Sequence, residues 1–201
     1  MESSQLIRIY EDESILVLDK PPGLVVDSGE TVKEETIQDI LIRDFQINLP
    51  RGGIVHRLDK DTSGIILVAK TEESLENLQS QFKERIIKKE YLALVHGLVE
   101  GLGTIEGSIG RNPGNREKFT VISPGRSQSP PSRWSKAEGK EAVTEYEPLK
   151  NLQFTIYNLQ LIFNDFNKIQ MRKLERQKYG EFTLLVCKPK TGRTHQIRVH
   201  L

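Results

Sequence analysis

Short apolar runs separated by polar turns dominate the chain, and this pattern predicts mostly β-strands. The first two runs, 6–10 and 14–18, flank the polar turn EDE as in a hairpin. The sequence DKPPG then ends the pattern, because proline lacks an amide donor and glycine frees the backbone. Further strands are expected at 54–55, 65–69, 90–97, 103–109, 117–122, 141–149, 153–162 and 181–187.

Two segments, 36–47 and 71–85, instead repeat their apolar residues at helical spacing. Each begins at a threonine, Thr36 or Thr71, that can cap a helix. Together these elements predict an α+β fold: a single domain over 1–201 with a mostly antiparallel, mixed central sheet flanked by a few helices and loops. Residues 122–140 and 164–180 are predicted to be flexible basic loop insertions, the second being a hairpin extension or a short helix.

Composition excludes several classes of protein. With 36% hydrophobic and 28% charged residues, the chain has the profile of a soluble globular protein. It lacks both an apolar run of the roughly 20 residues that span a bilayer and a secretory signal, so we expect a cytoplasmic protein with no membrane partner. The one cysteine, Cys187, and four histidines without paired-ligand spacing predict no disulfide and no metal site. Any catalysis would then use ordinary side chains.

Charge is distributed unevenly along the chain, although the net charge is only +1. Residues 1–110 carry 12 basic and 20 acidic side chains, whereas residues 111–201 carry 17 and 8. This asymmetry indicates either a basic face for a polyanionic partner or two halves that neutralise each other across a folded interface.

The stretch GGIVHRLDKDTSGIILVAK, residues 52–70, places many charged side chains between two apolar runs that read as a hairpin. Residues 61–64 suit a tight turn. His56 is either a hydrogen-bonded structural residue or an acid or base. Asp59 follows Leu58 directly after an apolar run, where an unpaired buried carboxylate costs several kcal/mol. Asp59 is therefore expected to have a cationic or hydrogen-bonding partner and is a candidate site residue.

The end of the chain offers that partner. If 192–201 is extended, Arg198 lies on an interior strand, on the same side as Thr194, Gln196 and His200. His195, Ile197, Val199 and Leu201 then point the other way. A bidentate ion pair between Arg198 and Asp59 is our hypothesis.

Four motifs in this order, DKPPGLVV, HRLDKDTSGIILVAK, KKEYLALVHG and TGRTHQIRVHL, resemble those of the RluA-type pseudouridine synthases. The resemblance implies the pseudouridine synthase fold and the isomerisation of uridine in RNA, without metal or organic cofactor. Two departures are the enlarged loops 122–139 and 164–180. A third is that such proteins continue with further strands beyond the motif that ends at Leu201, so we expect a fragment or a shortened version with an incomplete sheet.

The resemblance also implies roles for individual residues. Asp59 is the catalytic carboxylate, which attacks the anomeric carbon, attacks the uracil ring or promotes a glycal intermediate; these routes stay open. Tyr91 stacks on the uracil and assists proton transfer, and Arg198 keeps Asp59 ionised and aimed. Arg57 assists extrusion of the base or contacts a phosphate. The remaining predicted substrate contacts are His56, Ile197 and Leu201.

The implied partner is ribosomal or transfer RNA, bound by a monomer. Because strands begin at Leu6, we expect target choice to fall to this domain itself. Predicted phosphate contacts are Arg111, Arg116, Lys118 and Arg193, with Arg126, Arg133, Lys168, Arg172, Lys173 and Arg176 as further candidates. Two alternatives are a non-catalytic RNA-binding module that retains the scaffold, and a metal-independent hydrolase that uses Asp59 and His56.

Overall fold

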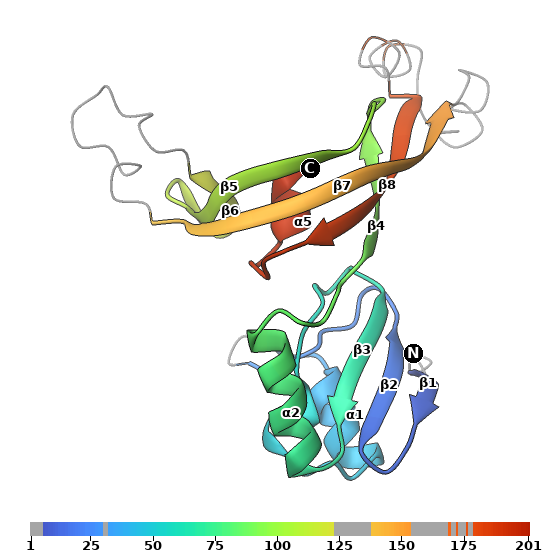
Figure 1. The fold of residues 1–201 in the computed structure, drawn as a ribbon, viewed down its shortest axis with the longest axis vertical. Helices are drawn as coiled ribbons and strands as arrows, with labels where there is room; N and C mark the ends of the chain where they lie inside the picture. The colour runs from blue at the N-terminus through green and yellow to red at the C-terminus, as the bar shows by residue number, and fades with distance from the viewer. Residues whose placement is uncertain are drawn as a thin grey trace. The chain divides into compact units, whose positions relative to one another are not determined.

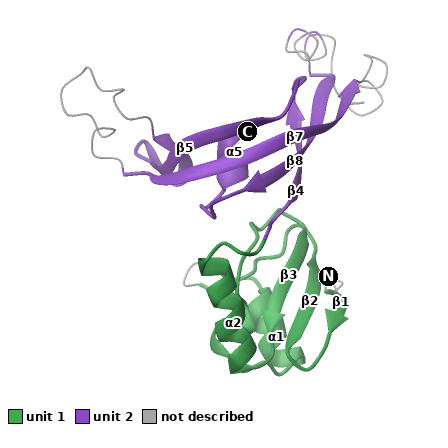
Figure 2. Cartoon of the chain, viewed as in Figure 1, with its two compact units in different colours: residues 1–87 green, residues 88–201 purple. Residues whose placement is uncertain are grey.

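The chain divides into two compact units, residues 1–87 and 88–201 (Figure 2). This structure is a computed structural model, and it describes residues 6–29, 32–122, 138–153, 169, 172, 176 and 179–201. The division describes how each half packs, and the single catalytic domain stays a prediction.

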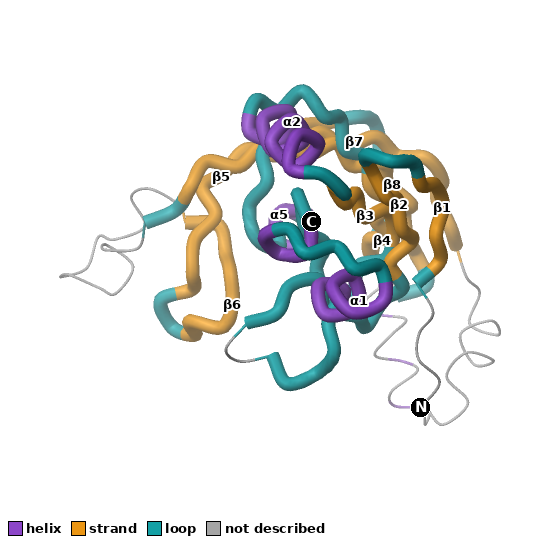
Figure 3. Tube along the Cα trace, turned by 90° about the horizontal axis from the view of Figure 1, so that it is seen from below, coloured by secondary structure: helices purple, strands orange, loops and turns teal. Residues whose placement is uncertain are grey.

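The first unit is a small antiparallel sheet covered by helices. Strands β1 (Ile7–Glu11), β2 (Ile15–Lys20) and β3 (Gly64–Ala69) pair in the order β1-β2-β3, which confirms the first predicted hairpin. Helices α1 (Ile37–Asp44) and α2 (Glu72–Lys83) lie on one face of this sheet (Figures 1 and 3). That face is completely buried at Leu16, Leu18, Ile66 and Val68.

Both predicted helices are confirmed, with the predicted caps. The Thr36 hydroxyl accepts the Asp39 amide, and the Asp39 carboxylate accepts the Thr36 amide at 2.9 Å. Thr71 and Ser74 form the same reciprocal pair at the start of α2. Each pair satisfies amide groups that have no partner within the helix.

The predicted strand at 54–55 is wrong. A short 3-10 helix, η1 (Pro50–Gly53), leads into Ile54, which makes one isolated bridge to Val68. Gly53 permits this approach, because its φ is +76° and a Cβ there would lie 2.1 Å from the Ala69 carbonyl oxygen. β3 uses β2 as its ladder partner instead, so 52–70 is a long connection and not a hairpin.

The second unit is a five-stranded sheet in the order β4-β8-β7-β5-β6, with antiparallel pairs throughout. Its strands are β4 (Tyr91–His96), β5 (Gly103–Asn112), β6 (Asn115–Ile122), β7 (Lys140–Gln153) and β8 (Glu181–Pro189), followed by helix α5 (Gln196–His200). The α+β class with antiparallel sheets is confirmed. Cys187 is completely buried in β8.

One strand predicted for the second unit needs correction, and another lies mostly outside the described residues. The strand predicted at 141–149 continues to Gln153, and a bulge between Pro148 and Lys150 accommodates the interruption in its pattern. The rest of the predicted strand 153–162 lies outside the described residues, as do 123–137 and most of the basic segment 164–180.

Candidate active site

Asp59 lies on a turn that directly follows buried side chains. Ile54 is 1% exposed and Leu58 is 7% exposed, so the chain is fixed immediately before the half-buried Asp59. The Thr62 amide donates to the Asp59 carbonyl at 3.1 Å and closes the turn. Of the predicted turn residues 61–64, Asp61 and Thr62 lie in this turn, whereas Gly64 is the first residue of β3 and has a φ of +128°.

The buried side chain of Lys20 binds the backbone of this turn. Its side chain is completely buried at the end of β2, and Nζ donates to the Pro21 carbonyl at 2.8 Å and to the Lys60 carbonyl at 2.7 Å. The Gly23 amide donates to the same Lys60 oxygen at 2.9 Å. Burial lowers the pKa of Lys20, while the charges of Asp61 and Asp59 act in the opposite direction. The backbone next to Asp59 is therefore bound by two donors.

Sequence reasoning missed Lys20. The available signal was the alternation along β2, in which Leu16, Leu18 and Lys20 occupy the same buried face. A lysine at an inward position of a strand requires acceptors inside the protein, since burying an ammonium group without them is costly.

His56 has a structural role in this turn. Its Nε2 accepts the Leu67 amide at 3.0 Å, and its ring stacks on Phe82 with centroids 4.9 Å apart. The hydrogen bond requires a lone pair on Nε2, so the neutral ring carries its proton on Nδ1. His56 thereby links the turn to β3 and α2, and its predicted substrate contact stays a prediction.

Arg57 points into solvent beside a second arginine. Its side chain is 65% exposed, and Nη1 lies 3.4 Å from Asp27 Oδ2. Arg51 binds the same carboxylate more closely, with Nη2 at 2.7 and 2.6 Å from its two oxygens. One carboxylate thus faces two guanidinium groups, which leaves this surface positive and suited to an anionic ligand.

Arg198 lies on a helix, and the predicted extended strand is wrong. α5 turns the segment 196–200 into a helix in which Gln196 is buried and Arg198 is exposed. The alternation predicted for Thr194, Gln196, Arg198 and His200 is therefore absent, and Arg198 is not an interior strand residue. Residues two apart lie about 200° apart around a helix, so burial of Gln196 directs Arg198 away from the sheet.

Gln196, the second residue that sequence reasoning missed, anchors α5. Its Oε1 accepts the Thr191 hydroxyl at 2.7 Å and the Arg193 amide at 3.0 Å. Its Nε2 donates to the Val143 carbonyl at 3.0 Å and to the Thr144 hydroxyl at 2.9 Å. Both polar atoms of the Gln196 side chain thus bind β7 or the preceding turn, and these bonds hold the segment 196–200 in its helical conformation. Nothing in the local sequence marked Gln196, because its partners in β7 lie about 50 residues earlier in the chain.

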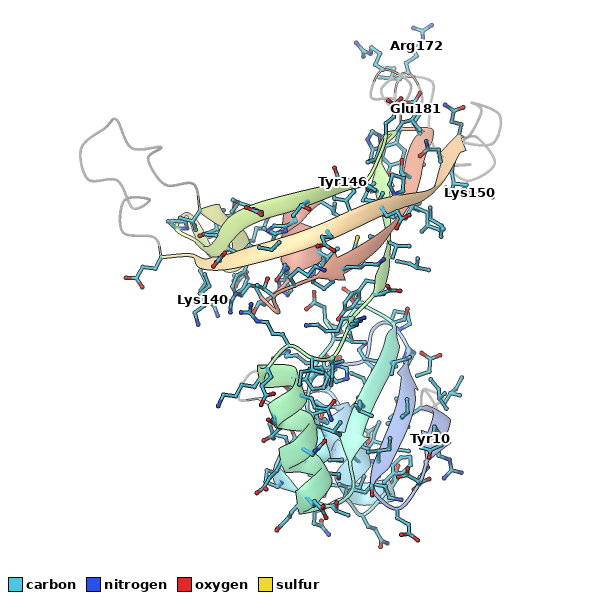
Figure 4. All side chains as sticks on the ribbon, viewed as in Figure 1. Tyr10, Lys140, Tyr146, Lys150, Arg172 and Glu181 are labelled. Atoms are coloured by element: carbon cyan, nitrogen blue, oxygen red, sulfur yellow. The ribbon has the colours of Figure 1, made fainter. Side chains whose placement is uncertain are left out.

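Tyr91 lies on the face of the sheet that carries α5. It pairs with Cys187 in β8, which pairs with Tyr146 in β7 (Figure 4). Thr144, two residues from Tyr146 and hence on the same face, contacts the α5 side chains Gln196 and His200. The second unit therefore presents Tyr91 and the helix of Arg198 on one surface, whereas Asp59 belongs to the first unit.

The other predicted contacts are dispersed over the second unit. Ile197 is half-buried on α5, and Leu201 is 43% exposed. Arg111 and Lys118 are exposed on β5 and β6, Arg116 lies in β6, and Arg193 donates from Nε to the Glu141 carbonyl at 2.8 Å. Among the further basic candidates, Arg172 (Figure 4) and Arg176 are described, and both are exposed. Arg126, Arg133, Lys168 and Lys173 lie outside the described residues.

Neither a metal cluster nor a membrane span appears in the part of the chain that the structure describes. No three or more His, Cys, Asp or Glu side chains there are grouped so as to hold a metal ion. None of the described helices has the length and apolar character needed to cross a bilayer.

Comparisons with curated proteins give consistent matches. The chain is 38% identical over 201 residues to the ribosomal large subunit pseudouridine synthase D of Borreliella burgdorferi, covering 96% of this chain and 49% of that protein. It is 39% identical over 198 residues to an uncharacterized RNA pseudouridine synthase of Aquifex aeolicus, covering 96% and 50%. The chain spans about half the length of the curated relatives it matches.

Solved structures give the same result at the level of the fold. Human RNA pseudouridylate synthase domain containing 1 matches with a TM-score of 0.67 and 24% identity, over all of this chain and 66% of that one. Human RNA pseudouridylate synthase domain containing 4 matches with a TM-score of 0.61 and 25% identity, over 96% and 62%. The family model for RNA pseudouridylate synthase matches residues 14–201. The chain belongs to the RNA pseudouridylate synthase family.

Proposed function

We propose that this chain isomerises uridine to pseudouridine in RNA, with ribosomal RNA of the large subunit as its substrate class. The family match from residue 14 to residue 201 supports the reaction, and the names of the curated relatives support the substrate. In this reaction the bond from uracil N1 to the sugar C1′ breaks and a bond from C5 to C1′ forms. A proton leaves C5 and another is gained at N1, so no oxidant or reductant is needed.

Asp59 is the proposed catalytic carboxylate. Loss of the N1–C1′ bond leaves positive charge at C1′, and a nearby carboxylate stabilises that charge, attacks the carbon or removes a proton. The observation that carries this assignment is the anchoring of its turn, in which Leu58 is buried before Asp59 and two donors bind the Lys60 carbonyl after it. A catalytic group held in this way requires little reorganisation during the reaction.

The second unit supplies the proposed partners of the uracil and of the carboxylate. We place Tyr91 against the base and Arg198 beside Asp59, where a guanidinium and a carboxylate form a charge-assisted bidentate pair. Their common surface and the exposure of Arg198 support these roles. Arg57, exposed next to Arg51, is the proposed contact on the RNA side during extrusion of the target base.

The test is Asp59→Asn with Asp61→Asn as its matched control. Both changes remove one carboxylate from the same turn, and Asp61 is exposed. The assay follows release of tritium from large-subunit ribosomal RNA labelled at uracil C5. We expect Asp59→Asn to lose at least about 10²-fold in rate and Asp61→Asn to lose little, because only Asp59 touches the reacting atoms.

The other outcomes identify the alternatives. Activity of the Asp59 variant close to the parent's would refute the proposed mechanism. RNA binding by a folded parent chain without tritium release would leave a non-catalytic RNA-binding module. Release of free uracil would indicate a hydrolase, although the engagement of His56 Nε2 with the Leu67 amide already opposes its use as the base.

A further inference from the structure

One group of side chains in the second unit plays no part in the proposed chemistry. The guanidinium carbon of Arg111 lies 5.2 Å from the centre of the Phe119 ring. His195 packs perpendicular to the same ring, with centroids 5.5 Å apart and an interplanar angle of 83°. We name Arg111, Phe119 and His195 the cation–ring cluster.

The fold brings these three residues together from separate elements. Arg111 and Phe119 are directly opposite each other in the β5–β6 ladder, so their side chains share one face of the sheet. His195 immediately precedes α5 and holds a left-handed backbone, with φ 54° and ψ 27°. This conformation is costly for a residue other than glycine.

The chemistry of the cluster suits an anion. A guanidinium that stacks on a ring uses its flat face for the ring, and its N–H donors lie in the plane and point outward. Arg111 is exposed, so its placement does not serve the sheet core. From residue 107 to residue 122 the chain carries three basic side chains and one acidic one. An anionic partner is therefore favoured at this end of the sheet.

We propose that the cation–ring cluster is an RNA-contact site, in which Arg111 binds a backbone phosphate and Phe119 acts through Arg111 by fixing the guanidinium. This inference rests on the proposed function, which supplies RNA as the anion. His195 lies three residues before Arg198, about one helical turn away. The phosphate bound here belongs to a nucleotide close to the target uridine.

Five variants, one of them the double variant of Phe119→Leu with Arg111→Gln, test the proposal by fluorescence anisotropy with a fluorescein-labelled, uridine-rich RNA hairpin. Arg111→Gln removes the charge, Arg111→Lys keeps the charge without the planar stack, and Phe119→Leu removes the ring. The matched control, Arg8→Gln, removes an exposed arginine from β1 in the first unit. Thermal unfolding of each variant checks that the fold is retained.

Arg111→Gln is expected to weaken binding about 3- to 10-fold and to reduce the slope of log Kd against log salt concentration by about 0.7, the loss of one phosphate contact. Arg111→Lys and Phe119→Leu are expected to weaken binding about 2- to 5-fold with the slope unchanged. Adding Phe119→Leu to Arg111→Gln should weaken binding no further, because Phe119 acts through Arg111.

Equal binding by Arg111→Gln and Arg8→Gln overturns the proposal, as does full additivity of the Phe119 and Arg111 variants. These results are independent of catalysis. If binding to the hairpin depends on Arg111 but no tritium is released, the contact site is supported and the proposed function is refuted. If tritium is released but the affinity for RNA does not depend on Arg111, the proposed function is supported and the contact site is refuted. A folded parent that binds no RNA overturns both.

Discussion

Replacing Lys20 by methionine removes the buried ammonium group beneath the Asp59 turn while keeping a side chain of similar length. Lys20 donates to the Pro21 and Lys60 carbonyls. After the replacement the Lys60 oxygen keeps the Gly23 amide, whereas the Pro21 oxygen loses its lysine donor. The turn then has one anchor where it had two.

The effect on stability follows from these partners. Hydrogen bonds from a charged donor contribute about 1.5–3 kcal/mol each, but the cost of burying the ammonium group offsets much of that gain. The remaining cost is that of a carbonyl with a lost donor, about 1–3 kcal/mol. We expect the free energy of unfolding of Lys20→Met to fall by that amount.

The effect on activity is expected to be larger than stability alone explains. A displacement of about 1 Å in a catalytic group costs up to about 10²-fold in rate, and Lys60 is the next residue after Asp59. We therefore expect kcat for tritium release to fall about 10-fold or more at a temperature where the variant is folded. KM should change little, because Lys20 is completely buried and does not reach the RNA.

Lys70→Met is the matched control in the same unit. Lys70 donates to the Glu11 carboxylate at 2.8 Å and to the Asp12 carbonyl, and it follows the last residue of β3, whereas the turn precedes the first. Urea denaturation and tritium-release kinetics are measured for both variants. A rate for Lys20→Met equal to that of Lys70→Met would refute the positioning role, whatever the loss of stability.

Two further predictions concern α5. Burial lowers the pKa of His200 below the unfolded value of about 6.5, so the unfolded chain takes up the proton first as pH falls. Lowering the pH from about 7.5 to about 5.5 should therefore reduce the free energy of unfolding more in the parent than in His200→Leu, as measured by urea denaturation. An equal reduction in both proteins would contradict this. Gln196→Leu should lower the free energy of unfolding by about 1–3 kcal/mol for each buried group left unpaired and lower kcat through Arg198. Unchanged urea denaturation and kcat in Gln196→Leu would refute the anchoring role.

Local patterns predicted the elements that depend on neighbouring residues. Thr36 and Thr71 marked helix starts, because a capping hydroxyl and its partner lie three residues apart in the sequence. The alternating strands from Tyr91 onward were found for the same reason. The strand at 54–55 failed because a glycine with φ +76° brings Ile54 against β3 for a single bridge, and apolar character alone does not separate that from a ladder.

The site was predicted less completely than the fold. Asp59 and Arg198 became candidates because charged residues next to apolar runs stand out, and their roles stay predictions. The extended course of 192–201 was wrong, because Gln196 has partners in β7, about 50 residues earlier, that no local pattern reveals. Lys20 was missed for the same reason, since the acceptor at Lys60 is distant in sequence.

In both units a buried polar side chain hydrogen-bonds the backbone near a proposed catalytic side chain. In the first unit the completely buried Lys20 binds the backbone beside Asp59, and in the second the buried Gln196 binds the turn before Arg198. Each anchor is polar, so it fixes backbone groups by directed hydrogen bonds, which apolar packing does not provide. Substituting an anchor should therefore change kcat, which depends on the position of the charged group. Substituting the charged group should change the chemistry itself.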